Sequence, residues 1–438
     1  MQEETFMAFV EKSSGLPESY DVIVCGGGPS GWVAAVAAAR LGCRTALIER
    51  FGFFGGTATA GLVVPISGFF KNGSRVVGGI PWEFEQEMER HGAAFAEMPK
   101  GHISVDTEYY KLIAQRMVLD SGVVVYTNSL VSEVLRDGKL ITGIRAVGNE
   151  GPFEIRGKNF IDATGNGNIC SMAGISTRTS QTPQPLSLCF ELIGVDTSTP
   201  LLRDSIHHTG KEGTHSLNTE IHDYLDGLYS EQKAPQFGGP WFNTMLSGDR
   251  LAVNITRSNS TSLNARDYMT AEFQMREDMF RLLDILKNKY PEFKNCSISA
   301  SAVNAGIREG RHLVGVHTLT GDELMRAEHF EDSVARNAHP IDMHCADGSS
   351  QVLQELSEAG YIPYRSLISP EADNVIVCGR AISVDDAAHA SIRVQATAMA
   401  VGQAAGTAAA LCSRCGYSVH QLPAHELQKT LTGQNAIL

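Results

Sequence analysis

One stretch near the start of the chain, residues 20–49, constrains the fold more than any other. Residues 21–25 (DVIVC) form a continuous apolar run with β-branched side chains, which predicts a fully buried parallel strand. The glycine-rich turn 26–31 (GGGPSG) follows directly, and the small-residue segment 32–41 predicts a helix. A second apolar strand then ends at Glu49. Strand, glycine turn, helix, strand and acid in this order predict a βαβ unit that binds a dinucleotide.

Each glycine of the turn solves a different steric problem. Gly26 permits the tight turn, Gly28 lets a diphosphate approach the backbone, and Gly31 lets the helix pack on the strand. The amide groups and the positive dipole end of the helix then face the diphosphate. Glu49 lies 23 residues after Gly26, the separation expected for an acid that accepts hydrogen bonds from an adenosine ribose. The alternatives are a purely structural turn and a solvated carboxylate at a strand end.

Later segments indicate which dinucleotide is bound. An NAD enzyme needs only one such unit with a catalytic domain beside it. In this chain a second glycine-rich stretch, 51–59, follows the acid, and the segment 374–411 predicts a strand, a loop and a helix that return to the same site. The amino end of such a helix stabilises negative charge that develops on a reduced flavin. These features favour FAD.

The pieces of the nucleotide-binding domain are spread along the chain. Strand-like segments at 160–165 and 374–380 join the opening unit, and Asp137-Gly138 predicts a hairpin between two further strands. The interval from about residue 187 to residue 360 differs from these pieces, because it has charged loops and an amphipathic helix at 265–289. We therefore expect an α/β fold with a Rossmann-like FAD-binding domain on a parallel sheet and an inserted α+β substrate or cap domain. The expected bounds are 19–186 and 361–438 for the FAD-binding domain and 187–360 for the inserted domain.

Composition and charge limit which partners and which cellular location we expect for the protein. The formal net charge of −13 argues against nucleic acid, because phosphate neutralisation needs a surplus of Lys and Arg. The chain opens without a basic, apolar leader and contains no uninterrupted run of about 20 apolar residues, so we expect neither secretion nor a membrane span. Nine scattered cysteines suit reduced, buried thiols and a cytoplasmic location. The sequence does not indicate the oligomeric state.

Seven segments occur in an order typical of one family. They are DVIVCGGGPSGWVAAVAAARLGCRTALIER, FGGTATAGLV, IDATGNG, IREGRHLVG, HPIDMH, YIPYRSL and VIVCGRAISVDDAAHASIRVQATAMAVGQAAGTAAAL. Over residues 19–438 the chain thereby resembles bacterial FAD-dependent oxidoreductase flavoproteins, which are similar to the glutathione-reductase type and more distantly to succinate dehydrogenase and fumarate reductase flavoproteins. The resemblance implies hydride transfer between a substrate carbon and flavin N5, with a small-molecule substrate and an electron donor or acceptor that the sequence does not identify.

The resemblance also assigns cofactor-binding positions. The ADP, the diphosphate, the adenine and the ribityl chain are expected at Gly26, Gly28, Pro29, Ser30, Gly31, Glu49, Arg50, Gly55, Gly56, Thr57, Val131, Ala163, Gly165, Gly379 and Arg380. Two positions depart from the family pattern. Asn166 stands where an aspartate is common, and Glu309-Gly310-Arg311 replaces an arginine-rich stretch, which leaves the charge pattern of the active site open.

Four residues are predicted to be catalytic. In the resembled dehydrogenases an arginine at the position of Arg393 contacts a substrate carboxylate; the alternative is an internal salt bridge or a diphosphate contact. His389 is predicted to move a proton, the alternative being a packed histidine bonded to backbone. Arg308 and Arg365 are expected to line the cleft, or else to form ion pairs with Glu309 or another acid. Tyr364 is either a proton donor or a core aromatic.

The remaining motifs do not predict a site. His339 and His344 flank Asp342, but no third ligand follows at helical spacing, so we expect no metal. Cys412 and Cys415 form a lone CxxC far along the last helix, and no residue is singled out for a covalent flavin link. The prediction is an FAD-dependent dehydrogenase or reductase of a small polar, anionic organic substrate. The alternatives are a flavin-dependent biosynthetic or modifying enzyme and a non-catalytic flavin-binding protein.

Overall fold

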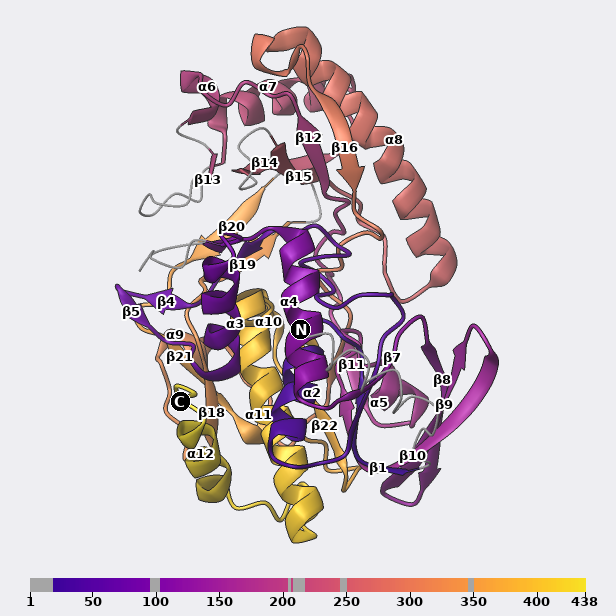
Figure 1. Ribbon diagram of the computed structural model, residues 1–438. Helices are drawn as coiled ribbons and strands as arrows, with labels where there is room; N and C mark the ends of the chain where they lie inside the picture. The colour runs from indigo at the N-terminus through magenta and orange to yellow at the C-terminus, as the bar shows by residue number, and fades with distance from the viewer. Residues whose placement is uncertain (1–18, 95–102, 204–205, 208–216, 245–249, 346–349) are drawn as a thin grey trace.

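The computed structural model describes residues 19–94, 103–203, 206–207, 217–244, 250–345 and 350–438. Figure 1 shows a larger body, built from the early and late parts of the chain, and a smaller lobe built from its middle. The helix α8 (Ala265–Lys289) runs along the outer side of the smaller lobe, at the bounds predicted for the amphipathic helix. Among the helices that the structure describes, none has the length and apolar character needed to cross a bilayer.

The larger body is organised by a seven-stranded sheet. Its strands, from one edge, are β7 (Val124–Tyr126), β2 (Thr45–Ile48), β1 (Ser19–Cys25), β10 (Gly151–Asp162), β9 (Leu140–Gly148) and β8 (Leu130–Asp137), with β22 (Val375–Val377) also paired to β10. The strands β7, β2, β1, β10 and β22 run parallel, whereas β8, β9 and the first half of β10 form an antiparallel extension. The Rossmann-like parallel sheet predicted from the sequence is confirmed, and its carboxyl ends meet at one edge.

Two helices from opposite ends of the chain pack unusually closely beside this sheet. They are α2 (Pro29–Arg40) and α11 (Gln395–Cys415). A Cβ at Gly402 would lie 2.2 Å from the backbone oxygen of Ser30, and one at Gly406 would lie 2.1 Å from that of Ala34. Only glycine permits this approach, so the last long helix fixes the helix that follows the glycine turn.

The segment before α11 differs from the sequence-based expectation of one helix over 392–411. A separate helix, α10 (Asp386–Ile392), is followed by Arg393 as its C-cap, and α11 begins after Val394. The predicted loop is helical because the Asp385 side chain accepts the Ala388 amide hydrogen at 2.7 Å and caps α10. His389 therefore lies within a helix, and Arg393 lies at its carboxyl end.

The smaller lobe has its own sheet and core. Its sheet has the order β13 (Ile206–His207), β14 (Phe237–Thr244), β15 (Arg250–Thr256), β12 (Phe190–Ile193) and β16 (Ser297–Ser301), and α6 (Pro200–Arg203), α7 (Thr219–Ser230) and α8 accompany it. Its buried core extends from Phe190 to Cys296. Leu313, Leu324 and Ile341 pack instead into the core of the larger body. The apolar side chains from Leu313 onward thus share a core with the larger body, and the expected bounds of 187–360 for the inserted domain stay a prediction.

The described residues 311–345 and 350–363, which follow the smaller lobe in the chain, contain short elements. They are β17 (Arg311–Leu313), α9 (Gly321–Met325), β18 (Ser333–Asn337), β19 (Ile341–His344), β20 (Gln351–Gln354) and β21 (Gly360–Pro363). The other elements are α3 (Gly79–Arg90), α4 (Thr107–Asp120), α5 (Asn168–Met172), α12 (Ala424–Gly433), β3 (Pro65–Ile66), β4 (Phe70–Lys71), β5 (Ser74–Arg75), β6 (Ile103–Ser104) and β11 (Thr177–Thr179).

Candidate active site

A cavity of about 200 Å³ lies at the carboxyl ends of the parallel strands, against the glycine turn. Gly26 has a φ of +105°, and a Cβ there would lie 2.4 Å from the Ala163 oxygen. At Gly31 a Cβ would lie 1.8 Å from the Gly26 oxygen, so the helix could not approach the turn. At Gly28 a Cβ would meet nothing within 4 Å, which leaves the backbone open toward the cavity. This arrangement fits a diphosphate held at the amino end of α2.

Glu49 is fixed at the other side of the same cavity. Its Oε2 accepts the Gly27 amide hydrogen at 2.5 Å, and its Oε1 accepts that of Phe51 at 2.9 Å. Burial raises the pKa of Glu49, and the two backbone hydrogen bonds oppose that shift. The carboxylate thus bridges the glycine turn and the loop after β2, where it can accept hydrogen bonds from a ribose.

The late segment closes the cavity. Gly379, with a φ of +71°, packs over Ser30, and Arg380 donates from Nη2 to Asn166 Oδ1 at 3.0 Å. The Nε of Arg380 is buried without a hydrogen-bond partner among the described residues. Burial lowers the pKa of Arg380 to about 10. An unsatisfied, buried guanidinium nitrogen beside an open glycine turn fits an anionic or polar cofactor atom.

The structure places almost all predicted cofactor-binding residues around this cavity. Those that line it are Gly26, Gly28, Pro29, Ser30, Glu49, Arg50, Gly56, Thr57, Val131, Ala163, Gly165, Gly379 and Arg380. Gly31 and Gly55 do not line it. Gly31 provides the helix contact described above, and Gly55 donates its amide hydrogen to the Gly27 oxygen at 2.9 Å, which holds the second glycine-rich stretch against the turn.

A second cavity, of about 190 Å³, adjoins the first and shares Thr57, Arg380, Arg393 and Gln395 with it. Both lobes contribute to its wall, the smaller one through Trp241 on β14. Three arginines and one aspartate line it: Arg308, Arg380, Arg393 and Asp342. This excess of positive charge, next to the first cavity, favours an anionic ligand.

Arg393, Asp342 and His344 form a connected group in the second cavity. Arg393 Nη2 donates to the Asp342 main-chain oxygen at 3.0 Å and to Asp342 Oδ2 at 3.1 Å. His344 Nε2 lies 3.4 Å from the same Oδ2. Although burial would raise it, the pKa of Asp342 is held well below its usual value by the hydrogen bond with His344 and the charge of Arg393. Asp342 therefore remains ionised and orients both partners.

The protonation state of His344 follows from its surroundings. Burial, followed by the charge of Arg308, holds the pKa of His344 well below its usual value, and Asp342 only partly opposes this. The imidazole is therefore neutral near pH 7 and can accept a proton. Arg308 is itself oriented, since its Nη1 donates to the Pro185 oxygen and to Ser187 Oγ, both at 2.7 Å.

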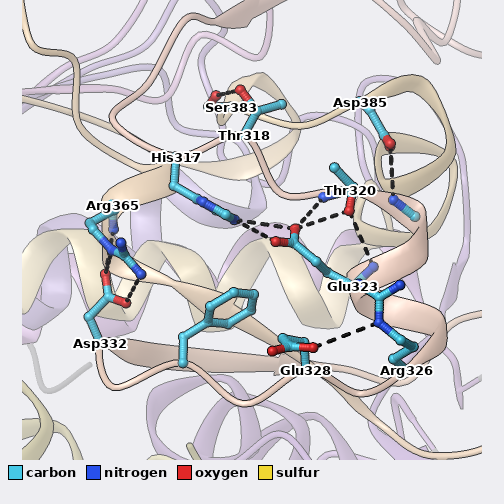
Figure 2. Close-up of polar contacts among 12 residues, drawn as sticks. His317, Thr318, Thr320, Glu323, Arg326, Glu328, Asp332, Arg365, Ser383 and Asp385 are labelled. Atoms are coloured by element: carbon cyan, nitrogen blue, oxygen red, sulfur yellow. Dashed lines mark hydrogen bonds and ion pairs between the residues drawn. The ribbon is translucent and has the colours of Figure 1, made fainter.

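Three of the expected residues lie away from both cavities. Arg365 forms an ion pair with Asp332, with its Nε 3.1 Å from Asp332 Oδ2, and its side chain is 48% exposed (Figure 2). This matches the ion-pair alternative rather than a cleft position. Tyr364 is a buried core residue whose hydroxyl donates to the Val419 oxygen at 3.0 Å. His389 is fully buried within α10 and borders neither cavity.

Several residues of the second cavity are not predicted by any sequence motif. The sequence indicates Asp342 and His344 only as possible metal ligands, and Trp241, Asn243 and Gln395 belong to no motif. Asp342 and His344 stand two apart in β19, so both side chains emerge on one face of the strand. That two-residue spacing, read as a strand rather than a helix, is the signal that could have found them.

The parallel sheet, the open glycine turn and the carboxylate after the second strand define a nucleotide-binding protein of Rossmann-like fold. The sequence matches the family described as FAD dependent oxidoreductase over residues 21–431. The chain belongs to this family, and FAD is its cofactor. The predicted bacterial subgroup within it stays a prediction.

Curated relatives match shorter parts of the chain. A dihydrolipoyl dehydrogenase of Trypanosoma brucei brucei is 60% identical over 38 residues, which cover 9% of this chain and 8% of that protein. Leghemoglobin reductase of Glycine max is 29% identical over 167 residues (37% and 30%), and digeranylgeranylglycerophospholipid reductase 2 of Methanopyrus kandleri is 28% identical over 192 residues (40% and 46%). The chain thus spans less than half the length of each of these relatives.

Solved structures match nearly the whole chain. A geranylgeranyl bacteriochlorophyll reductase-like protein from Thermoplasma acidophilum is 16% identical with a TM-score of 0.50, and the flavin-dependent brominase Bmp2 is 13% identical with a TM-score of 0.50. Each match covers 95% of this chain and 84% of the other. At these identities the likeness shows a shared fold only.

Proposed function

We propose that the protein is a dehydrogenase or reductase that acts on a small, anionic organic molecule in the second cavity. The observation that carries this proposal is the group of three arginines and one aspartate around a cavity that adjoins the cofactor site. When bound in the first cavity, FAD supplies the hydride acceptor or donor. The residues of the chain supply binding, orientation and proton movement.

Binding of an anion rests on groups that are already oriented but not fully used. Arg393 is held by Asp342 through Nη2, whereas its Nε is buried without a partner among the described residues. Asn243 Oδ1 and Gln395 Oε1, also in the second cavity, are unpartnered acceptors. A molecule with a carboxylate and a neighbouring hydroxyl or amine would satisfy both kinds of group.

Proton movement is assigned to His344. The neutral imidazole lines the cavity, and Asp342 stabilises the protonated ring when it forms. Oxidation of an alcohol or amine requires removal of a proton as the hydride leaves, and reduction requires its return. The edge-to-face contact with Trp241, at 5.4 Å between ring centroids, restricts the ring orientation.

The test is anaerobic reduction of the bound flavin by a panel of small carboxylates, followed by absorbance. Arg393→Ala should keep FAD but lose substrate-driven bleaching, because it removes the unused donor. Arg365→Ala is the matched control, since this arginine lies outside both cavities, and it should bleach as the wild type does. The proposal is contradicted if no carboxylate of the panel reduces the oxidised flavin of the wild type and none reoxidises its reduced flavin. A biosynthetic or non-catalytic role would then remain. Loss of FAD in Arg393→Ala would reassign this residue to the cofactor.

A further inference from the structure

Three side chains from two segments of the chain meet inside the larger body, and none of them lines either cavity. Glu309 precedes β17, His312 belongs to β17, and His389 belongs to α10. Pairing of β17 with β11 and capping of α10 by Asp385 hold these segments in place. The exposed fractions of the three residues are 7%, 0% and 0%, respectively.

The polar atoms of this cluster face one another without bonding. Glu309 Oε1 lies 3.7 Å from His312 Nε2 and 3.8 Å from His389 Nδ1, which is too long for a hydrogen bond. The two imidazole rings have centroids 4.4 Å apart. Within the part of the chain that the structure describes, Glu309 Oε1 and all four ring nitrogens lack a hydrogen-bond partner. Five unsatisfied polar atoms in one buried place are costly, which favours a bound group that satisfies them.

The remaining polar contacts of the cluster leave its free oxygen and nitrogen atoms facing one another. Glu309 Oε2 accepts the Gln184 amide hydrogen at 3.0 Å, which directs Oε1 toward the histidines. Each imidazole can offer the lone pair of a ring nitrogen to a metal ion, and within the described residues no protein group bonds to these nitrogens.

We propose that Glu309, His312 and His389 bind a divalent transition-metal ion, of the kind that zinc and iron(II) represent. One potential ligand atom from each side chain lies within 4.8 Å of the others. Metal–ligand bonds of about 2.0–2.2 Å place two ligand atoms about 3–4 Å apart, so the observed spacing needs only a small contraction. Two imidazoles with one carboxylate suit zinc and iron(II), whereas magnesium and calcium prefer oxygen ligands. The proposal differs from the expectation of no metal, which was drawn from His339, Asp342 and His344 and stays a prediction.

The site would join two segments that carry residues of the second cavity. Glu309 directly follows Arg308, and His389 precedes Arg393 by one turn of α10. A shared ion would therefore fix the backbone on which both arginines stand. These three residues are positioning residues in this scheme, because none of them lines the cavity.

The experiment measures metal in the full-length, FAD-containing protein after chelator treatment and separate reloading with Zn²⁺ or, without oxygen, Fe²⁺. We expect about one ion per chain by elemental analysis, and a higher thermal midpoint when loaded. Glu309→Gln and His389→Asn should weaken binding by roughly 10–100-fold or more. His420→Asn, a partly exposed histidine that bonds to the Ala372 oxygen, is the control and should bind as the wild type does.

Two outcomes would overturn the proposal. One is a folded wild-type protein that retains neither ion after reloading; the other is equal binding by the wild type and both cluster variants. If the variants do not fold, X-ray absorption of the loaded wild type decides, because two imidazoles in the first coordination sphere support the site and their absence refutes it. These measurements need no substrate, so their result is separate from that of the proposed reaction.

Discussion

Glu85, on α3, gives a prediction whose size follows from the structure. Its side chain is fully buried, and both carboxyl oxygens lack a hydrogen-bond partner among the described residues. Burial, reinforced by Glu89, raises the pKa of Glu85 from 4.5 to about 8. Between these values the folded protein holds a proton that the unfolded chain has released. The free energy of unfolding therefore falls as the pH rises from about 4.5 to about 8.

The magnitude follows from the pKa difference. At about 1.4 kcal/mol per pKa unit, the free energy of unfolding is lower by roughly 4 kcal/mol at pH 8 and by roughly 1 kcal/mol at pH 5 than at a pH well below 4.5, where Glu85 is protonated in both states. Glu85→Gln removes the titration and keeps the size of the side chain. Relative to the wild type, the variant should therefore gain roughly 3 kcal/mol more stability at pH 8 than at pH 5.

Urea unfolding of both proteins at the two pH values measures this difference. Packing effects of the substitution are common to both conditions and cancel. Glu83→Gln is the control on the same helix, because its side chain is 47% exposed and its ion pair with Arg40 is at the surface. Its effect should change by less than about 1 kcal/mol between the two conditions. An equal effect of Glu85→Gln at pH 5 and pH 8 would show that this carboxyl titrates normally in the folded protein, and would refute the reasoning.

Two further predictions concern the cavities. Gly31→Ala places a Cβ 1.8 Å from the Gly26 oxygen, so it should displace α2, cost about 1–3 kcal/mol and release FAD, as measured by flavin retention on gel filtration. Gly227→Ala, with nothing within 4 Å, is its neutral control. For His344 the lowered pKa means that kcat/KM should be constant near pH 7–8 and should fall only at a pH well below 6.5. His344→Asn should abolish that acid limb and reduce kcat by about 10²–10⁴-fold; a profile unchanged by the substitution would remove His344 from the proton transfer.

The cofactor half of the molecule could be predicted because its signal is local. The turn from Gly26 to Gly31, the helix and Glu49 carry their geometry within one short unit, and steric needs fix the residue types. The second cavity depends on long-range packing. Nothing near Arg365 in the sequence shows that β18 and β21 bring it to Asp332, and nothing near Asp342 shows that α10 brings it Arg393. The buried cluster of Glu309, His312 and His389 could not be predicted for the same reason, because Glu309 and His389 are far apart in the sequence.

The close packing of α11 on α2 has a consequence for how the protein is made. The glycine turn leaves the ribosome long before the surface that supports its helix, because β22, Gly379 and α11 all lie much later in the chain. A nascent chain that has not yet reached Gly406 therefore exposes an alanine-rich helix face and an incomplete cofactor pocket. A complete pocket for FAD therefore forms only after α11 has been made, and a chain without α11 lacks the support for the glycine turn.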